Sequence, residues 1–179
     1  MANQVLETWR KLQGMVEQPR AAPYDLRLLS PDEASAAATP FRSLIDLWLS
    51  RRGDATVPDW SSFEFADFRG WHEWLGVSVF PGDEPDPCFR ILGEGWKSIS
   101  SFDFTGLCMS EYLPRLYRLQ LRAHMSAIRE TGCIGLCAGQ SALVNREFVH
   151  LQIVELPVRR GGERIDGLIH AIEAQRQPA

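Results

Sequence analysis

The sequence predicts an α+β domain in which five strands form two groups separated by helices, with further helices at the N-terminus. The chain has 179 residues, 45% of them hydrophobic, which suits one domain with a real core. Short apolar runs bounded by turn residues lie before residue 94 and after residue 133, as expected for strands. Between them, apolar residues recur at helical spacing.

The N-terminal part is predicted to be a helix followed by a linker. Over residues 2–18, apolar residues recur about every three to four positions, as in a helix: Val5, Leu6, Trp9, Leu12 and Val16. Residues 19–40 are rich in Pro and Ala and show no sustained period, which indicates an arm or linker. We therefore assign residues 1–40 to an N-terminal helix and linker.

A second helix is predicted over residues 41–52. Its apolar stripe consists of Leu44, Ile45, Trp48 and Leu49, and Gly53 is expected to end it. Residues 41–62 thus form a flanking helix and a connection. The aromatic-rich stretch that follows predicts a short helical piece at residues 65–75 with much buried aromatic area.

The main domain is assigned to residues 63–175. Residues 77–80 and 88–93 predict two antiparallel strands, and short helices and loops follow. A long helix is expected from Ser110 to about Glu130, with an apolar face made of Leu113, Tyr117, Leu121, His124 and Ile128. Three more strands are predicted at residues 134–144, 148–158 and 165–172, with turns at 145–147 and 160–162.

Several local sequences resemble the PAS domain superfamily. Residues 89–94, Phe-Arg-Ile-Leu-Gly-Glu, resemble its second strand, and residues 103–106, Asp-Phe-Thr-Gly, resemble its recurrent Asp-x-Thr-Gly turn. More narrowly, residues 41–173 resemble short stand-alone bacterial PAS proteins. Further features of that group are Leu47-Trp48, Arg52-Gly53, Pro58 near Phe63, and Glu155-Leu156-Pro157.

The resemblance implies a PAS-like five-stranded antiparallel sheet whose helical flank encloses a ligand-sized cavity. It also implies a sensory or regulatory module that binds a small ligand or a signalling partner, such as a histidine kinase, and acts through protein–protein interaction. PAS domains often pair through the sheet and an N-terminal amphipathic helix, so we expect a homodimer. The apolar stripe on residues 2–18 could form the dimer contact, but packing of this helix on its own domain explains the stripe equally well.

The ligand-binding candidates lie on the long helix, the short helices and the penultimate strand. They are His124, Tyr117, Leu121, Trp96, His150 and Gln152. Some PAS domains bind haem through a histidine on the long helix, but a core histidine satisfied by hydrogen bonds is the favoured interpretation of His124. His150 and Gln152 share one face of their strand, with His170 on the next, and would orient a ligand or else meet solvent or a dimer partner.

The cysteines indicate neither a metal site nor a flavin photoadduct. The four cysteines include no Cys-x-x-Cys pair, so reduced thiols are expected. Cys133 and Cys137 would lie about 13 Å apart on one strand face, which favours small buried thiols. Cys108 stands one residue too early for the flavin-binding Gly-x-x-Cys motif of light sensors. No cofactor is assigned.

Composition and motifs exclude several classes of function. A formal charge of -4 with scattered basic residues argues against nucleic acid as a partner. No run approaches the roughly 18 apolar residues of a membrane span, so a cytoplasmic protein without membrane contact is expected. Phosphate-binding, nucleophile-elbow and metalloprotease motifs are lacking, so no enzyme is predicted. The alternative is a small α+β enzyme with an enclosed pocket, of the isomerase or dehydratase type, with a histidine base.

Overall fold

The computed structural model describes residues 24–141 and 149–176. The predicted helix at residues 2–18 and the predicted turn at 145–147 lie outside the described residues. Among the described helices, none combines the length and the apolar character that crossing a bilayer would require.

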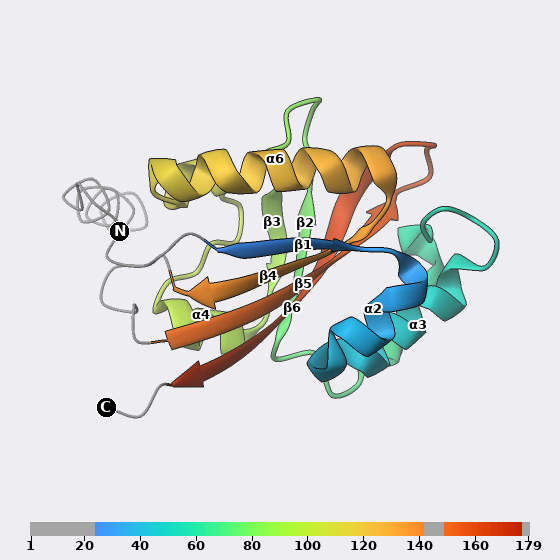
Figure 1. Ribbon diagram of the computed structural model, residues 1–179, viewed down its shortest axis with the longest axis horizontal. Coiled ribbons are helices and arrows are strands. Elements are labelled where there is room, and N and C mark those ends of the chain that lie inside the picture. Colours follow the sequence, from blue (N-terminus) through green and yellow to red (C-terminus); the bar gives the residue numbers. More distant parts are fainter. Residues whose placement is uncertain (1–23, 142–148, 177–179) are drawn as a thin grey trace.

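A six-stranded antiparallel sheet forms the centre of the molecule (Figure 1). Its order is β1-β4-β5-β6-β2-β3. The strands are β1 (Asp25–Leu29), β2 (Leu75–Val79), β3 (Cys88–Leu92), β4 (Ile134–Gln140), β5 (Val149–Arg159) and β6 (Ile165–Arg176). The five predicted strands are all present, in two groups as expected, and the α+β class is confirmed.

The sixth strand, β1, corrects the prediction that residues 19–40 form only an arm or linker. β1 pairs with β4, with Leu26 opposite Cys137 and Leu29 opposite Ile134. Helix α2 (Pro31–Ala37) follows directly, and the Ser30 hydroxyl donates to Glu33 at 2.6 Å in a capping box. Five strand residues and seven helix residues are too few to show a clear hydrophobic period, so the sequence pattern did not reveal them.

The predicted helix at residues 41–52 is confirmed as α3 (Arg42–Arg52), which ends at Gly53 with a φ of 54°. The predicted helical piece at residues 65–75 is shorter than expected, since the described 3₁₀ turn covers only Phe65–Phe68. Its aromatic packing is uneven: Phe68 is buried and stacks on Phe63, whereas Phe65 is 77% exposed.

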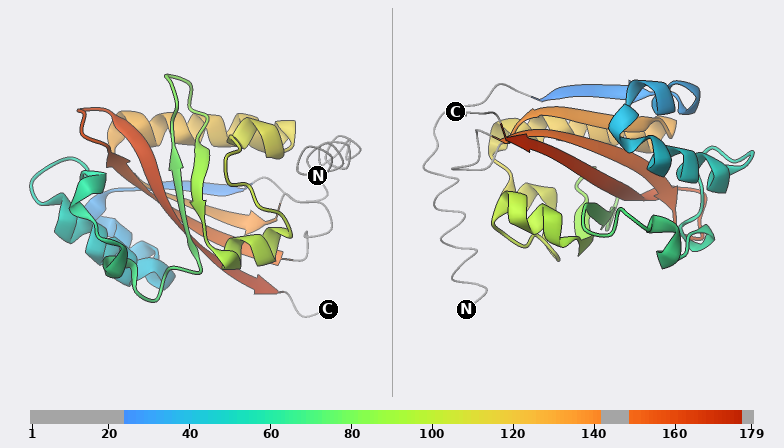
Figure 2. Two further views of the ribbon diagram at one scale, coloured as in Figure 1. Left: turned by 180° about the vertical axis from the view of Figure 1, so that it is seen from behind. Right: turned by 90° about the horizontal axis from the view of Figure 1, so that it is seen from below.

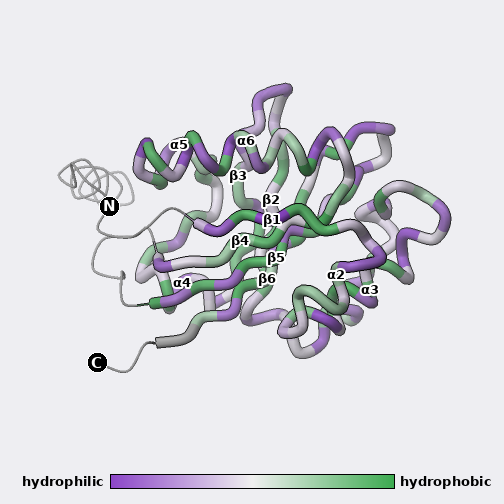
Figure 3. Tube along the Cα trace, viewed as in Figure 1, coloured by the Kyte–Doolittle hydropathy of each residue, from purple (hydrophilic) through white to green (hydrophobic). Residues whose placement is uncertain are grey.

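The predicted long helix is divided in two. Helix α5 (Met109–Tyr112) ends at Leu113, whose ψ of 143° is extended, and α6 (Arg115–Thr131) begins after Pro114. A residue before proline is disfavoured in helical conformation, which explains the break. From Tyr117 onwards the predicted buried face is confirmed, and hydrophobic and hydrophilic bands alternate along the helix (Figure 3).

Both faces of the sheet are covered. On one face Val154, Leu156 and Ile169 belong to the core cluster that includes α2 and α3. Trp48 of α3 is fully buried there and donates its indole N–H to the Pro157 carbonyl at 2.8 Å. The other face meets α5, α6 and α4 (Glu94–Ser100). Helix α4 and the α2–α3 pair lie at opposite ends of the molecule (Figure 2).

The Asp-x-Thr-Gly segment leads from α4 back to the sheet at β3. The Asp103 carboxylate accepts a bond from the Thr105 amide at 2.9 Å. Gly106 has a φ of 88°, a conformation that glycine adopts without strain, and its amide donates to the Phe89 carbonyl at 2.8 Å. These contacts give the turn an architectural role, because they fix the path of the chain beside β3.

Candidate ligand-binding cavity

A cavity of about 90 Å³ lies between the sheet and helices α4, α5 and α6. This volume is well above what a single water molecule needs. Its wall is mostly apolar, and its larger side chains include Phe89, Trp96, Phe104, Tyr112, Leu121 and Met125. The carboxylate of Glu155 on β5 and the imidazole of His170 on β6 also line it.

Aromatic rings build the side of the cavity nearest α4 and α5. The ring centroids of Phe104 and Tyr112 are 4.3 Å apart, with an angle of 20° between the ring planes. Phe89 and Trp96 meet at 5.5 Å. The Trp96 indole also donates to the Trp74 carbonyl at 2.6 Å, which fixes the ring against the sheet. Stacked and tilted ring pairs of this kind are favourable and hold their neighbours in place.

Glu155 forms a buried pair with His124 of α6. His124 Nε2 lies 2.7 Å from Glu155 Oε2, and each side chain is 4% exposed. The pair fits because Gly135 of β4 lies opposite Glu155 in the sheet and has no side chain. A Cβ at Gly135 would come under 3.0 Å from both partners. A buried carboxylate needs such a partner, because leaving it unpaired is costly.

His170 lies beside Glu155, directly opposite it in the β5–β6 ladder. Its Nε2 is 2.7 Å from the Ser78 hydroxyl, and its ring packs at 5.2 Å from that of Phe89. Burial lowers the pKa of His170 from 6.5 to about 4, although the nearby Glu155 opposes this shift. The imidazole is therefore neutral at physiological pH.

Two further groups on the cavity wall are held in their neutral forms. Burial raises the pKa of the Tyr112 phenol well above its ordinary value, and the charges of Asp86 and Glu155 add to this effect. Burial, with Glu155 and Asp25, likewise raises the pKa of the Cys137 thiol. Glu155 supplies the carboxylate of the cavity wall.

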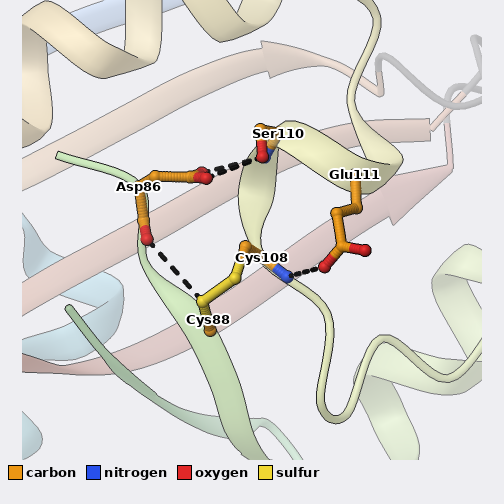
Figure 4. The surroundings of a disulfide bond; sticks show 5 residues. All are labelled: Asp86, Cys88, Cys108, Ser110 and Glu111. Carbon is orange, nitrogen blue, oxygen red and sulfur yellow. Dashed lines mark hydrogen bonds between the residues drawn. A yellow bond between two sulfur atoms is a disulfide. The ribbon is translucent and has the colours of Figure 1, made fainter. Parts of the chain in front are cut away.

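A disulfide between Cys88 and Cys108 corrects the expectation of reduced thiols (Figure 4). The two cysteines face each other across an isolated antiparallel bridge that spacing alone does not reveal. Hydrogen bonds reinforce the junction: Ser110 donates its amide to Asp86 at 2.9 Å and its hydroxyl at 2.6 Å. Cavity residues Pro87, Phe89 and Met109 are the immediate sequence neighbours of the two cysteines. Cys133 and Cys137 are free.

The structure brings some of the predicted ligand-binding residues to the cavity and places others elsewhere. Leu121 and Trp96 line it. Tyr117 is buried against Tyr24, with ring centroids 5.1 Å apart, and is not among the lining residues. His150 and Gln152 alternate with the lining residues of β5, so they lie on the opposite face of that strand.

His124 has the partner expected of a satisfied core histidine. Its Nε2 is engaged by Glu155, and it is not among the cavity-lining residues, so the pair does not present this nitrogen to a haem iron. Over residues 24–141 and 149–176, no group of three or more His, Cys, Asp or Glu side chains is arranged to hold a metal ion.

Sequence reasoning did not select Glu155 or Ser78 as site residues. A signal for Glu155 was present: it continues the face of Leu151 and Ile153 along the same strand, where a lone charged residue is unusual. Ser78 had no such signal, because its role depends on the neighbouring strand.

We found no match for this chain among protein-family models, curated proteins or solved structures.

Proposed function

We propose that the protein is a PAS-type regulatory module that binds a small molecule in this cavity and acts through contact with another protein. The observation that carries the proposal is the mostly apolar cavity with Glu155 and His170 on its wall. Ligand sites commonly combine an apolar wall with a few convergent polar groups. The resemblance of residues 41–173 to stand-alone PAS proteins supports the same function.

Retention of a ligand tests the proposal directly. Native mass spectrometry and an absorption spectrum of protein purified from its own host would reveal a bound small molecule or chromophore. A Leu121→Trp variant should fill the cavity and lose that molecule, because Leu121 lines it. Leu119→Trp is the matched control, since Leu119 lies on the same helix and is 60% exposed. Equal retention by both variants would contradict binding in the cavity.

The output of such a module would pass to a partner protein. A signalling protein such as a histidine kinase, or a second copy of this chain, is the partner class that the resemblance favours. Light scattering of the full chain with and without its ligand measures self-association. A mass equal to one chain in both states would leave a heterologous partner as the proposed recipient.

A small enzyme of the isomerase or dehydratase type is the second candidate, because Glu155 of the buried His–Glu pair lines the cavity. Glu155, on the wall, would exchange a proton with the substrate, and His124 would hold the carboxylate from behind. Incubation of the purified complex in heavy water tests this. Deuterium in a carbon-bound position of the ligand with the wild type, but not with Glu155→Gln, would favour the enzyme over the binding module.

A further inference from the structure

The carboxylate and the imidazole of the cavity wall lie in one row across the sheet. Gly135, Glu155, His170 and Gly76 are successive partners on β4, β5, β6 and β2. The two central residues carry the polar side chains, and a glycine stands on either side of them. At Gly76 an added Cβ would meet the Phe89 ring at 3.0 Å. The missing side chains of the two glycines thus leave space above the sheet, which His124 occupies at Gly135 and Phe89 at Gly76.

The two histidines next to Glu155 already have partners. His124 is engaged with Glu155 through Nε2, and His170 with the Ser78 hydroxyl through Nε2. The Glu155 carboxylate is different, because an ionised carboxylate has about four acceptor positions on two oxygens. Among the residues that the structure describes, its hydrogen bond comes from His124 and reaches Oε2. Glu155 therefore keeps acceptor capacity on the cavity side.

The remainder of the wall selects for apolar ligands. The rings of Phe89, Trp96, Phe104 and Tyr112 form much of it. Burial keeps the Tyr112 phenol protonated, and the low polarity of the surroundings strengthens any electrostatic contact with Glu155. A second negative charge beside Glu155 would meet strong repulsion in such a setting.

We infer that the cavity binds a small, mainly apolar molecule that donates one hydrogen bond to Glu155, and that it discriminates against carboxylate ligands of the same size. This inference rests on the proposed binding function and specifies its ligand class. The apolar part packs among the rings, and a hydroxyl or N–H group of the ligand points to the carboxylate.

Three probes that share one ring separate the contributions to binding. Toluene offers only the apolar body, phenol adds a donor, and benzoate adds a negative charge. Titration calorimetry with the full chain at neutral pH should rank phenol first, about tenfold tighter than toluene, because a hydrogen bond to a charged group is stronger than a neutral one. Benzoate should bind at least about tenfold more weakly than phenol.

A variant assigns the preference to one side chain. In Glu155→Gln the advantage of phenol over benzoate should shrink about tenfold or more, because the charge is gone. Glu173→Gln is the matched control, since Glu173 lies on the neighbouring strand and on the other face of the sheet. It should leave the ranking unchanged. The wild-type ranking is itself a test, even where Glu155→Gln does not fold.

Two results would overturn the inference. Benzoate that binds the wild type as tightly as phenol, or phenol no tighter than toluene, would show that Glu155 does not select the ligand, while the proposed binding function would stand. Absence of binding by all three probes would also contradict the inference. By contrast, equal binding to the wild type and to Leu121→Trp would contradict the cavity itself and with it the proposed function.

Discussion

Gly135 lies directly opposite Glu155 in the β4–β5 ladder, and its missing side chain leaves the space in which Glu155 meets His124. Gly135→Ala should therefore lower the free energy of unfolding by about 1–3 kcal/mol, the usual range for overpacking. Urea unfolding measures the change. Gly82→Ala is the control, because an added Cβ there has open space, and its effect should stay within about 0.5 kcal/mol. Equal stability of the two variants would argue against this packing.

The buried pair itself predicts strong coupling between its members. His124→Leu should lower the free energy of unfolding by about 3–5 kcal/mol, because it leaves the Glu155 carboxylate buried without a partner. The double variant His124→Leu, Glu155→Met should be closer to the wild type than His124→Leu alone, since both polar groups are then replaced by apolar ones. A double-mutant cycle from urea unfolding gives the coupling. Simple additivity of the two changes would refute the pairing.

Stability should depend on pH through His170. Its pKa is lowered from 6.5 to about 4 by burial, so the unfolded chain takes up a proton in this interval and the folded protein does not. The neutral His170 side chain therefore contributes to the free energy of unfolding. This contribution is fully present above pH 6.5 and is lost as the pH falls towards 4, by roughly 3 kcal/mol in all. Unfolding curves across this interval, compared with those of His170→Gln, isolate the effect. The variant should have a flatter profile, and parallel profiles would contradict the assignment.

Reduction of the disulfide should lower the free energy of unfolding, but the protein should stay folded. Cys88 and Cys108 are separated by 20 positions, and closing a loop of that length contributes about 3 kcal/mol in the chain-entropy model. The fold should persist, because the Met109 amide still donates to the Pro87 carbonyl at 2.9 Å and Ser110 still binds Asp86. Urea unfolding with and without a thiol reductant measures the loss. Cys133→Ser, at a free thiol, should respond to the reductant as the wild type does, whereas Cys88→Ser should not respond.

Features that depend on local period were predicted from the sequence. The stripe of Leu44, Ile45 and Trp48 marked α3, and the buried face of α6 from Tyr117 to Ile128 followed the helical spacing. These patterns survive because a helix buries one face whatever its neighbours are. The strand segments before residue 94 and after residue 133 were visible because apolar runs bounded by turn residues mark strands.

The site was less visible, because its residues meet through tertiary register. His124 and Glu155 are 31 positions apart in the sequence, and the packing of α6 over Gly135 brings them together. His150 and Gln152 were predicted to bind a ligand because they form the polar face of their strand. The cavity lies on the apolar face instead, where Glu155 is the charged residue among apolar ones. Which face of a strand meets a cavity is decided by packing, not by alternation alone.

The strand β1 has a consequence for how the chain is divided in experiments. A protein shortened to begin at Pro40 loses β1 and α2 together, and the backbone groups of β4 that β1 satisfies become an open sheet edge. Open edges recruit strands from other molecules. A dimer or aggregate of such a shortened protein would then report damage to the sheet. A shortened chain should therefore keep Tyr24, the residue before the strand, which packs on Tyr117.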